Sequence, residues 1–493
     1  MWPDTYASHR IYIGGSVFDP AVEAVEGALA AGAAYADART VVSRHQRIGA
    51  ANGRIDRVVE DVKAGVGVRA LIGSSWGFFA ANDFEAARDA GMQAAAIARA
   101  SARVAGEPLP LADVPVVEAS YSTPVEVDPF SVSVGDKADL LIAATSEMLA
   151  AEGVSRASGK LEFWETDKWF VSSQGHRIHQ HIVESGCGMD ALAMGDGESQ
   201  IRSYPQSFGQ YETGGYEVIE RWNLPGNTAR VADEAAALLG ADQCPSTVTN
   251  LVLEGSQLAL QIHESVGHAI ELDRILGWEA AFAGTSFLDL DQLGRLRYGS
   301  ELMNINADAT IPGALGTFGF DDEGTPAQRV PIVTAGTWVG VLSGRDTASI
   351  AGLPPGGMVR ADGHARIPMV RMTNVGLEPG PDSLEEIIAD TKSGILMDTN
   401  RSWSIDDRRL NFQFGCEVGW EIKDGRVGRM LKNPTYTGIT PQFWGSLDRL
   451  AGGDEWVHWG TPNCGKGQPG QVGHTGHSAA PARFHDVRVG VLG

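Results

Sequence analysis

The chain has 493 residues, of which 43% are hydrophobic and 20% are charged. These values are typical of a globular protein, and the length suffices for two or three domains with separate cores. The 62 acidic and 39 basic residues give a formal net charge of -23. Because an acidic surface repels nucleic-acid phosphates, general nucleic-acid binding is not expected, and the charge is interpreted mainly as an aid to solubility.

No apolar segment is long enough to span a bilayer, and residues 1–20 lack the basic start and apolar run of a secretory signal. We therefore expect no membrane partner. The cysteines are too few and too scattered for a disulfide framework: Cys187, Cys244, Cys416 and Cys464. A reducing, cytoplasmic location is expected, in which an unusual cysteine serves as a metal ligand or a nucleophile.

Residues 1–245 are predicted to form an N-terminal domain of mixed helix and antiparallel sheet. The predicted helices cover residues 20–33, 84–106, 136–151 (capped by Asp136) and 229–241. The predicted short strands cover residues 41–48, 55–62, 66–72, 76–80, 161–165, 169–173 and 178–184. The Asn52-Gly53 pair predicts a hairpin, because both central residues of a type I′ turn need positive φ. A helix followed by antiparallel strands occurs twice, which hints at an internal duplication.

Residues 246–493 are predicted to form a second domain, because the Cys244-Pro245-Ser246 sequence interrupts the helical pattern. A strand at residues 247–253 is followed by a helix at 256–273, and then by short strands with tight turns at Ala335-Gly336 and Asp424-Gly425. One further helix, at 383–390, has a capping box formed by its first residue, a serine, and the glutamate three positions later. The expected class is therefore α+β, with a mainly β, barrel- or sandwich-like second domain that carries a metal-binding helix.

The chemistry is expected at His263, Glu264 and His268, which share one predicted helix. Two imidazoles suit a metal ion, and a neighbouring carboxylate suits the activation of water. On a regular helix a spacing of five residues leaves the two rings ~140° apart. We therefore predict a local widening to an i→i+5 turn, eased by Gly267, so that both rings reach one ion.

A simpler interpretation of this segment needs no metal. Leu258, Ile262, Val266 and Ile270 recur at helical spacing and predict a buried stripe of an amphipathic helix. The two histidines are then only polar residues beside that stripe. A third potential ligand elsewhere in the chain is therefore important for choosing between the two interpretations.

Cys464 is the candidate third ligand, because it lies among glycines that let the backbone approach an ion, and Lys466 would favour its thiolate. A lone loop cysteine is otherwise simply a small buried residue. His474, His477 and His485 form a competing cluster near the C-terminus. They are either metal ligands or polar surface residues, and the second interpretation is preferred because loop histidines are usually exposed.

Several motifs occur in the order typical of the TldD/PmbA family of modulator-of-gyrase proteins, which the chain resembles over nearly its whole length. They are residues 65–69 (GVGVR) with 76–78 (WGF), the H-E-x-x-x-H of 263–268, 271–277 (ELDRILG), 321–324 (DDEG), 371–374 (RMTN) with 379–380 (PG), and 464–468 (CGKGQ). One departure follows Gln468, where histidines replace the apolar ending that the family pattern predicts. This departure concerns the lining of the site and the substrate preference.

The resemblance implies zinc on His263, His268 and Cys464, with Glu264 as general base. It also implies a TldD-type subunit that pairs with a PmbA-type (TldE) partner lacking the metal motif, and substrates such as microcin precursors and unfolded antitoxins. The expected function is therefore that of a zinc metallopeptidase that cleaves flexible or unfolded polypeptides. Glu271 and Asp273 are either carboxylates that orient a ligand histidine or ordinary helix-end residues, and the second interpretation is preferred.

Two other functions compete with this one. The first is a non-catalytic peptide-binding scaffold with structural zinc, although such a site needs no general base. The second is a metal-independent thiol hydrolase that uses Cys464 and a histidine. Chelation separates the possibilities, because it silences a metallopeptidase and spares a thiol enzyme.

Overall fold

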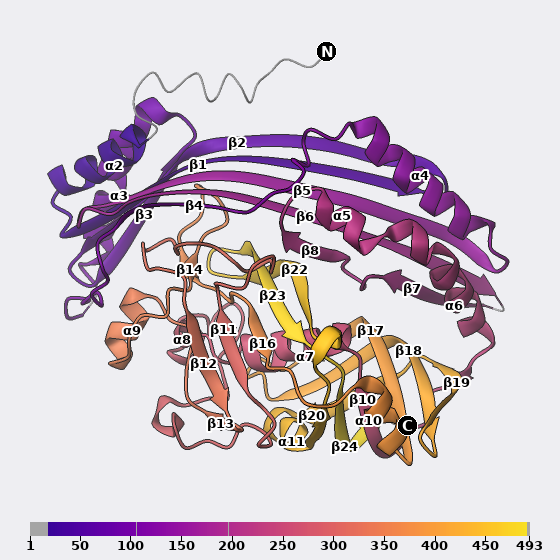
Figure 1. Cartoon of the computed structure of the whole chain (residues 1–493). Helices are drawn as coiled ribbons and strands as arrows, with labels where there is room; N and C mark the ends of the chain where they lie inside the picture. Colours follow the sequence, from indigo (N-terminus) through magenta and orange to yellow (C-terminus); the bar gives the residue numbers. More distant parts are fainter. Residues whose placement is uncertain (1–17, 105, 196, 491–493) are drawn as a thin grey trace.

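The computed structural model describes residues 18–104, 106–195 and 197–490 and confirms the predicted α+β class. A long curved sheet from the first half of the chain arches over the second half, which holds a smaller barrel and several short strands (Figure 1). Most of the segment 1–20, in which no export signal was found, lies outside the described residues. Within the described ranges, no helix is both long and apolar enough to cross a membrane.

Eight strands form the first sheet, in the order β3-β2-β1-β5-β6-β4, with β7 and β8 also paired to β6. Their bounds are β1 Tyr35–Ala51, β2 Arg54–Ile72, β3 Ser75–Ala81, β4 Glu118–Ser122, β5 Val154–Ser172, β6 Arg177–Gly195, β7 Glu198–Tyr204 and β8 Gln210–Thr213. The prediction of several short strands here is wrong. Polar residues such as those at 165–168 break the apolar alternation, but β1 and β6 pair with β5 on both sides and hold this segment in one strand of 19 residues.

Helices pack on this sheet near its two ends, with α2 and α3 at one end and α4 and α6 at the other (Figure 1). Their bounds are α2 Asp19–Ala30, α3 Ala87–Ser101, α4 Val134–Ala150, α5 Glu217–Trp222 and α6 Thr228–Gly240. Asn52 and Gly53 adopt φ of 52° and 73°, which confirms the predicted hairpin turn. The predicted cap of α4 is wrong: Ser133 is the N-cap, and its hydroxyl accepts from the Asp136 N–H three residues later.

The second half contains a closed five-stranded barrel. Around the barrel the order is β17, β10, β24, β20 and β18, and it closes because β17 pairs with both β10 and β18. The bounds are β10 Thr247–Leu253, β17 Ser393–Ile405, β18 Asn411–Lys423, β20 Thr435–Ile439 and β24 Ala482–Val489, with β9 Asp242–Gln243, β19 Arg426–Lys432 and β21 Leu447–Leu450 attached to its sheet. The division of the chain between residues 245 and 246 stays a prediction, and β9 already pairs with β19 of this sheet.

Shorter elements surround the barrel. One small sheet contains β11 Ile305–Asp308, β12 Arg329–Thr334, β13 Thr337–Trp338 and β16 Val375–Leu377. Two strand pairs are β14 Val359–Arg360 with β15 Met369–Val370, and β22 Val457–Lys466 with β23 Gln471–Ala479. The helices are α7 Gly255–Ile262, α8 Leu272–Ile275, α9 Arg345–Ala351, α10 Leu384–Asp390 and α11 Thr440–Gly445. The capping box of α10, made by Ser383 and Glu386, is confirmed.

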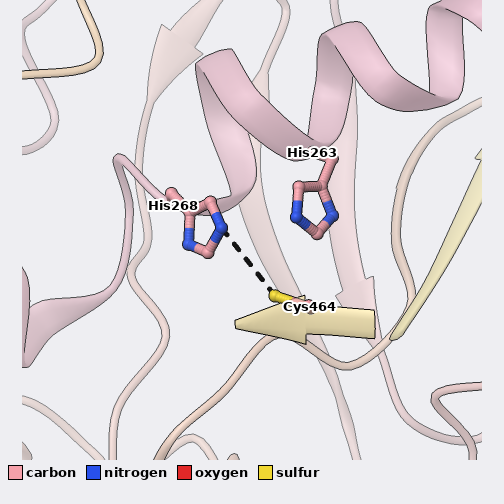
Figure 2. A group of neighbouring side chains, drawn as sticks. All are labelled: His263, His268 and Cys464. Carbon is pink, nitrogen blue, oxygen red and sulfur yellow. Dashed lines mark hydrogen bonds between the residues drawn. The ribbon is translucent and has the colours of Figure 1, made fainter. Parts of the chain in front are cut away.

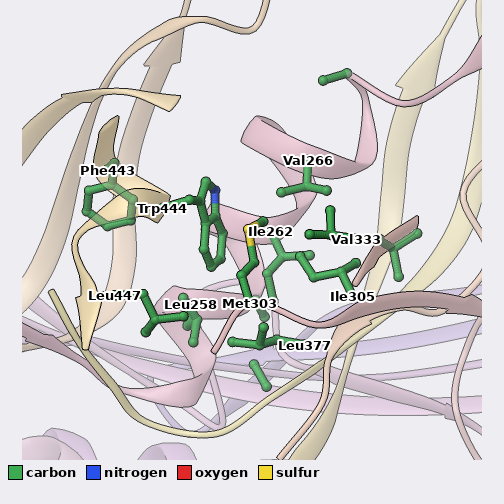
Figure 3. Packing of buried hydrophobic residues seen from close by; sticks show 14 of the residues in the cluster. Leu258, Ile262, Val266, Met303, Ile305, Val333, Leu377, Phe443, Trp444 and Leu447 are labelled. Carbon is green, nitrogen blue, oxygen red and sulfur yellow. The ribbon is translucent and has the colours of Figure 1, made fainter. Parts of the chain in front are cut away.

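Helix α7 follows β10 directly and is buried in the largest hydrophobic core of the molecule. Leu258, Ile262 and Val266 have no exposed surface and pack among side chains of the barrel and the small sheet (Figure 3). Burying an aliphatic side chain of this size contributes roughly 1.5–3 kcal/mol. The predicted apolar stripe is therefore present, and it anchors the segment that carries the two histidines.

Candidate metal centre

The segment from His263 to Gly267 is a π-helical turn, as the histidine spacing predicts. The His268 N–H donates to the carbonyl of His263 over an N···O distance of 3.1 Å, which is the i→i+5 pattern. The prediction of one continuous helix to residue 273 is wrong, because a separate helix, α8, begins at Leu272. The widened turn brings the centroids of the two imidazole rings to 4.8 Å from each other.

Gly267 is required for a different reason from the one that the sequence suggests. A Cβ atom at this position would lie 2.1 Å from the sulfur of Met372, whose side chain is fully buried. A larger residue here would have to displace the packed core. We therefore expect it to lower the stability of the whole domain as well as the affinity for metal.

His263, His268 and Cys464 are brought together at the end of this turn (Figure 2). One potential ligand atom from each residue lies within 4.8 Å of the others, and the Cys464 sulfur is 3.8 Å from Nε2 of His268. The three residues are only 5%, 4% and 3% exposed, respectively. Tetrahedral bonds of ~2.0–2.3 Å would separate such donor atoms by ~3.3–3.6 Å, so small adjustments would suffice to enclose an ion.

A second buried histidine fixes the orientation of His263. Nδ1 of His263 lies 2.8 Å from Nε2 of His477, and Nδ1 of His477 lies 2.9 Å from the carbonyl oxygen of Val375. Because a carbonyl only accepts, His477 donates from Nδ1 and accepts at Nε2, so His263 donates from its own Nδ1. This series of hydrogen bonds leaves the Nε2 lone pair of His263 free for a metal ion.

His268 is oriented by Glu271, whose carboxylate lies 3.0 Å from Nδ1 of that ring. The same carboxylate is 3.2 Å from the ammonium group of Lys466, which also bonds to Asp273 at 2.9 Å. Glu271 is fully buried, and although burial opposes its charge, Lys466 and His268 hold its pKa well below the usual value. Glu271 therefore contacts a candidate ligand directly, contrary to the preferred prediction, whereas Asp273 contacts the supporting lysine.

The protonation of the group suits metal binding. Burial lowers the pKa of both His263 and His268, which favours neutral imidazoles. Burial raises the pKa of the Cys464 thiol, but His268 and Arg371 outweigh it, and the net result is a lowered pKa. The predicted role of Lys466 is wrong, because its ammonium group is engaged by the two carboxylates described above. Two neutral imidazoles and an activated thiol form a suitable donor set for zinc.

Glu264 lies beside this group and is held by an arginine. Its carboxylate accepts a hydrogen bond of 2.7 Å from Nη1 of Arg409, and its side chain is 8% exposed. Arg409 has a left-handed backbone with a φ of 62°, in a turn that the Asp406 carboxylate stabilises by accepting from several N–H groups. A non-glycine residue in this conformation is strained, and such strain often occurs at functional sites.

A cavity of about 380 Å³ opens onto these residues. Both histidines, Glu264, Arg409 and Cys464 line it. Phe208 and Trp403 also line it, and their rings make an edge-to-face contact with centroids 5.7 Å apart. The volume lies within the usual range for sites that bind small ligands, and the lining combines reactive groups with apolar walls.

The competing histidine cluster is not a surface cluster as predicted. His477 is buried against His263, and His474 is mostly buried, with Nδ1 2.8 Å from the Glu184 carboxylate. Only His485 is exposed as expected. Sequence reasoning also missed Arg409, which lies in a polar turn of ordinary composition. The sequence gives one weak indication that His477 belongs to the site: it lies after Gln468, in the segment that departs from the family pattern.

The geometry defines a buried His-His-Cys group with an adjacent glutamate, on a two-part α+β fold. Three family models match the chain: PmbA/TldA metallopeptidase domain 1 at residues 36–102, the central domain at 127–241 and the C-terminal domain at 246–489. The chain belongs to the PmbA/TldA metallopeptidase family.

Similar proteins come from archaea and bacteria. A metalloprotease of Methanocaldococcus jannaschii is 29% identical over 82% of this chain and 86% of its own length. A metalloprotease of Methanothermobacter thermautotrophicus is 28% identical over 92% of this chain and 95% of its own length. A crystal structure of TldE from Thermococcus kodakarensis superposes with a TM-score of 0.70 at 15% identity, covering 96% of this chain and 100% of that one. At this low identity the structural match supports the fold alone.

Proposed function

We propose that the chain is a zinc-dependent metallopeptidase that cleaves peptide bonds in flexible polypeptides. The observation that carries the proposal is the group of His263, His268 and Cys464 beside Glu264 at one cavity. A 25% identical relative from Saccharolobus solfataricus, matched over 41% of this chain, is named a zinc metalloprotease TldD homolog, which supports the choice of metal.

The residues present fit a zinc ion. Each imidazole has its Nδ1 bonded to another side chain, which leaves Nε2 for the metal, and the pKa of the thiol is lowered. His263, His268 and Cys464 would hold the ion, with one position open to the cavity. When bound, zinc would supply the Lewis acidity that makes a water molecule nucleophilic near neutral pH.

Glu264 is the proposed general base. Its carboxylate would accept a proton from the attacking water and deliver it to the leaving nitrogen of the peptide bond. The hydrogen bond from Arg409 fixes the position of this carboxylate. Arg409 bonds to Oε2 of Glu264, and Oε1 has no hydrogen bond to a described side chain. Oε1 is therefore available to accept the proton.

The burial of the group supports flexible polypeptides as substrates. The three candidate ligands are at most 5% exposed, so a rigid protein surface could not approach them. An extended segment could enter the cavity, whose aromatic walls, Phe208 and Trp403, suit apolar side chains. A peptide held through its backbone would tolerate varied sequences.

A TldE-type partner subunit belongs to the proposal. The similarity of fold to TldE supports a pair of related subunits, of which this chain would be the metal-binding one. We also place the enzyme in the cytoplasm. All four cysteines are free and buried in the described part of the chain, in keeping with a reducing compartment.

A thiol hydrolase is the second candidate, and one contact favours it. The sulfur of Cys464 lies 3.8 Å from Nε2 of His268, an arrangement that could serve a nucleophile and its base. However, the same Nε2 atom is available for a metal because Nδ1 is bonded to Glu271. The glutamate beside His263 also has no task in a thiol mechanism.

Metal removal distinguishes the two candidates. Treatment of the full chain with a chelator, with and without its partner subunit, is expected to abolish cleavage of a fluorogenic peptide, and one equivalent of zinc should restore it. Metal analysis of the same samples provides the stoichiometry. If chelated protein free of zinc keeps its full rate and loses it on alkylation of Cys464, the thiol mechanism is correct and the proposal is wrong.

A further inference from the structure

A second and larger cavity lies between the long sheet and the barrel half of the molecule. Its volume is about 850 Å³, and the metal group does not line it. One wall is formed by β1, β2, β5 and β6, and the other includes residues 360–366 and 472–474, near β14 and β23 beneath the arch in Figure 1. Six arginine and lysine side chains line the cavity, against four carboxylates. The proposed reaction assigns no role to this space.

Two arginines of this cavity have no negatively charged partner. Neither Arg360 nor Arg371 forms an ion pair with a carboxylate of residues 18–104, 106–195 or 197–490. Arg360 donates to the carbonyl groups of Met372 and His474, and Arg371 donates to that of Cys464. Arg371 is only 1% exposed. Burial and the neighbouring Arg371 lower the pKa of Arg360 to about 10, so the Arg360 side chain remains charged near neutral pH.

The carboxylates that line the cavity already have partners. Asp322 is paired with Arg39 and Lys168, and Glu184 bonds to His474 at 2.8 Å. The remaining two interact locally: Asp61 with the neighbouring Lys63, and Asp362 with the N–H of Val472. Glu184 and Asp322 raise the pKa of Arg360 from a distance, but among the described residues no carboxylate of the cavity lies within ion-pair distance of Arg360 or Arg371.

The Cys464 thiolate is an alternative negatively charged partner. Arg371 does lower the pKa of that thiol. A thiolate that holds zinc, however, would have its charge satisfied by the ion and would not neutralise the two arginines. A buried guanidinium group, Arg371, and a half-buried one, Arg360, are costly without a carboxylate partner, and an anion bound between them would lower that cost.

We propose that this cavity binds a carboxylate of the polypeptide substrate, from an acidic side chain or the chain terminus, through Arg360 and Arg371. The assignment of this carboxylate to a peptide substrate rests on the proposed peptidase function, whereas the existence of an anion-binding site rests on the two arginines. Guanidinium groups bind carboxylates with paired, charge-assisted hydrogen bonds. In a chain with a net charge of -23, a local cationic cavity would select acidic segments that the rest of the surface repels.

Binding of fluorescein-labelled tetraglutamate to the zinc-loaded full chain tests this inference, with labelled tetraglutamine as the reference peptide. We expect saturable binding of tetraglutamate only, displaced by inorganic phosphate and weakened by salt. Arg360→Gln should weaken binding by at least ~10-fold with an unchanged zinc content. The matched control is Arg366→Gln in the same cavity. Its side chain is exposed and, among the described residues, bonds only to the carbonyl of its neighbour Ala365, so less than a ~2-fold effect is expected.

Each other result contradicts the inference. If the wild type binds the two peptides equally, or binds neither, the anion site is excluded. Both of these results come from the wild type, so they apply even if Arg360→Gln does not fold. Binding of phosphate in a titration without binding of tetraglutamate indicates a small-anion site and not a substrate site. Loss of zinc from Arg360→Gln would show that the arginine supports Cys464 instead. Peptide cleavage that persists without tetraglutamate binding would leave the peptidase proposal intact while excluding this one.

Discussion

Replacing Glu264 with glutamine is expected to lower the rate of peptide cleavage by ~10²–10⁴, the usual effect of losing a general base. The amide oxygen of glutamine can still accept the hydrogen bond that Arg409 now donates to the carboxylate at 2.7 Å. Position and packing are therefore kept, and only the basic group is removed. The fall should occur in kcat, because the glutamine still fits the cavity.

Zinc content separates this effect from a loss of the metal. Because Glu264 is not among the three candidate ligands, the Glu264→Gln protein should bind one zinc per chain, the same content that we expect for the wild type. Glu301→Gln is the matched control, since this glutamate is 88% exposed and makes only a weak ion pair with Arg297 at 3.9 Å. Undiminished turnover by Glu264→Gln would exclude its role as the base.

Replacing Cys464 with alanine is expected to remove zinc and activity together. Loss of the residues that support a ligand typically costs ~10–100-fold in metal affinity, so loss of a ligand itself should cost more than ~100-fold. The remaining imidazoles, His263 and His268, would leave the ion with two protein donors. Zinc titration by competition with a chromogenic chelator measures the change.

Cys187→Ala is the matched control for this variant. Cys187 is also a fully buried thiol, but it lies in the core under the first sheet, where burial raises its pKa to about 12. Both variants lose the same sulfur atom from a packed interior, so the thermal stabilities of the zinc-free proteins should fall by similar amounts. Equal zinc affinity in the two variants would show that Cys464 is not a ligand.

The sequence predicted those parts of the site that depend on local geometry. Five-residue spacing between His263 and His268 requires a widened turn, because a regular helix cannot bring the two rings together. Cys464 was recognised by its glycine neighbours and by the order of motifs along the chain. These features are local, or are repeated in a family pattern, and both kinds of signal are visible in one sequence.

The contacts that orient the site could not be predicted, because the fold brings distant residues together. Arg409 is 145 positions from Glu264, and His477 is 214 positions from His263. Neither segment differs in composition from an ordinary turn or strand. Their roles depend on the closure of the barrel and on the β22–β23 hairpin, which place them beside the π-helical turn.

The lengths of the strands were not predictable for a related reason. The sequence predicts two short strands, at residues 55–62 and 66–72, where the structure has the single strand β2, whose first part is mostly exposed. The backbone of β2 is paired with β1 from Arg54, opposite Ala51, to Leu71, opposite Tyr35. Hydrogen bonding to a long neighbour, and not the side chains of the segment itself, sets the length of such a strand.

X-ray absorption at the zinc edge tests the proposed ligand set of the metal centre, because it reports the atoms bound to the metal in the intact protein. For the zinc-loaded wild type, we predict one sulfur at ~2.3 Å and two imidazole nitrogens at ~2.0–2.1 Å. The sulfur contribution should be absent from any zinc that Cys464→Ala retains. A spectrum of the wild type with only nitrogen and oxygen neighbours would contradict a metal centre formed by His263, His268 and Cys464.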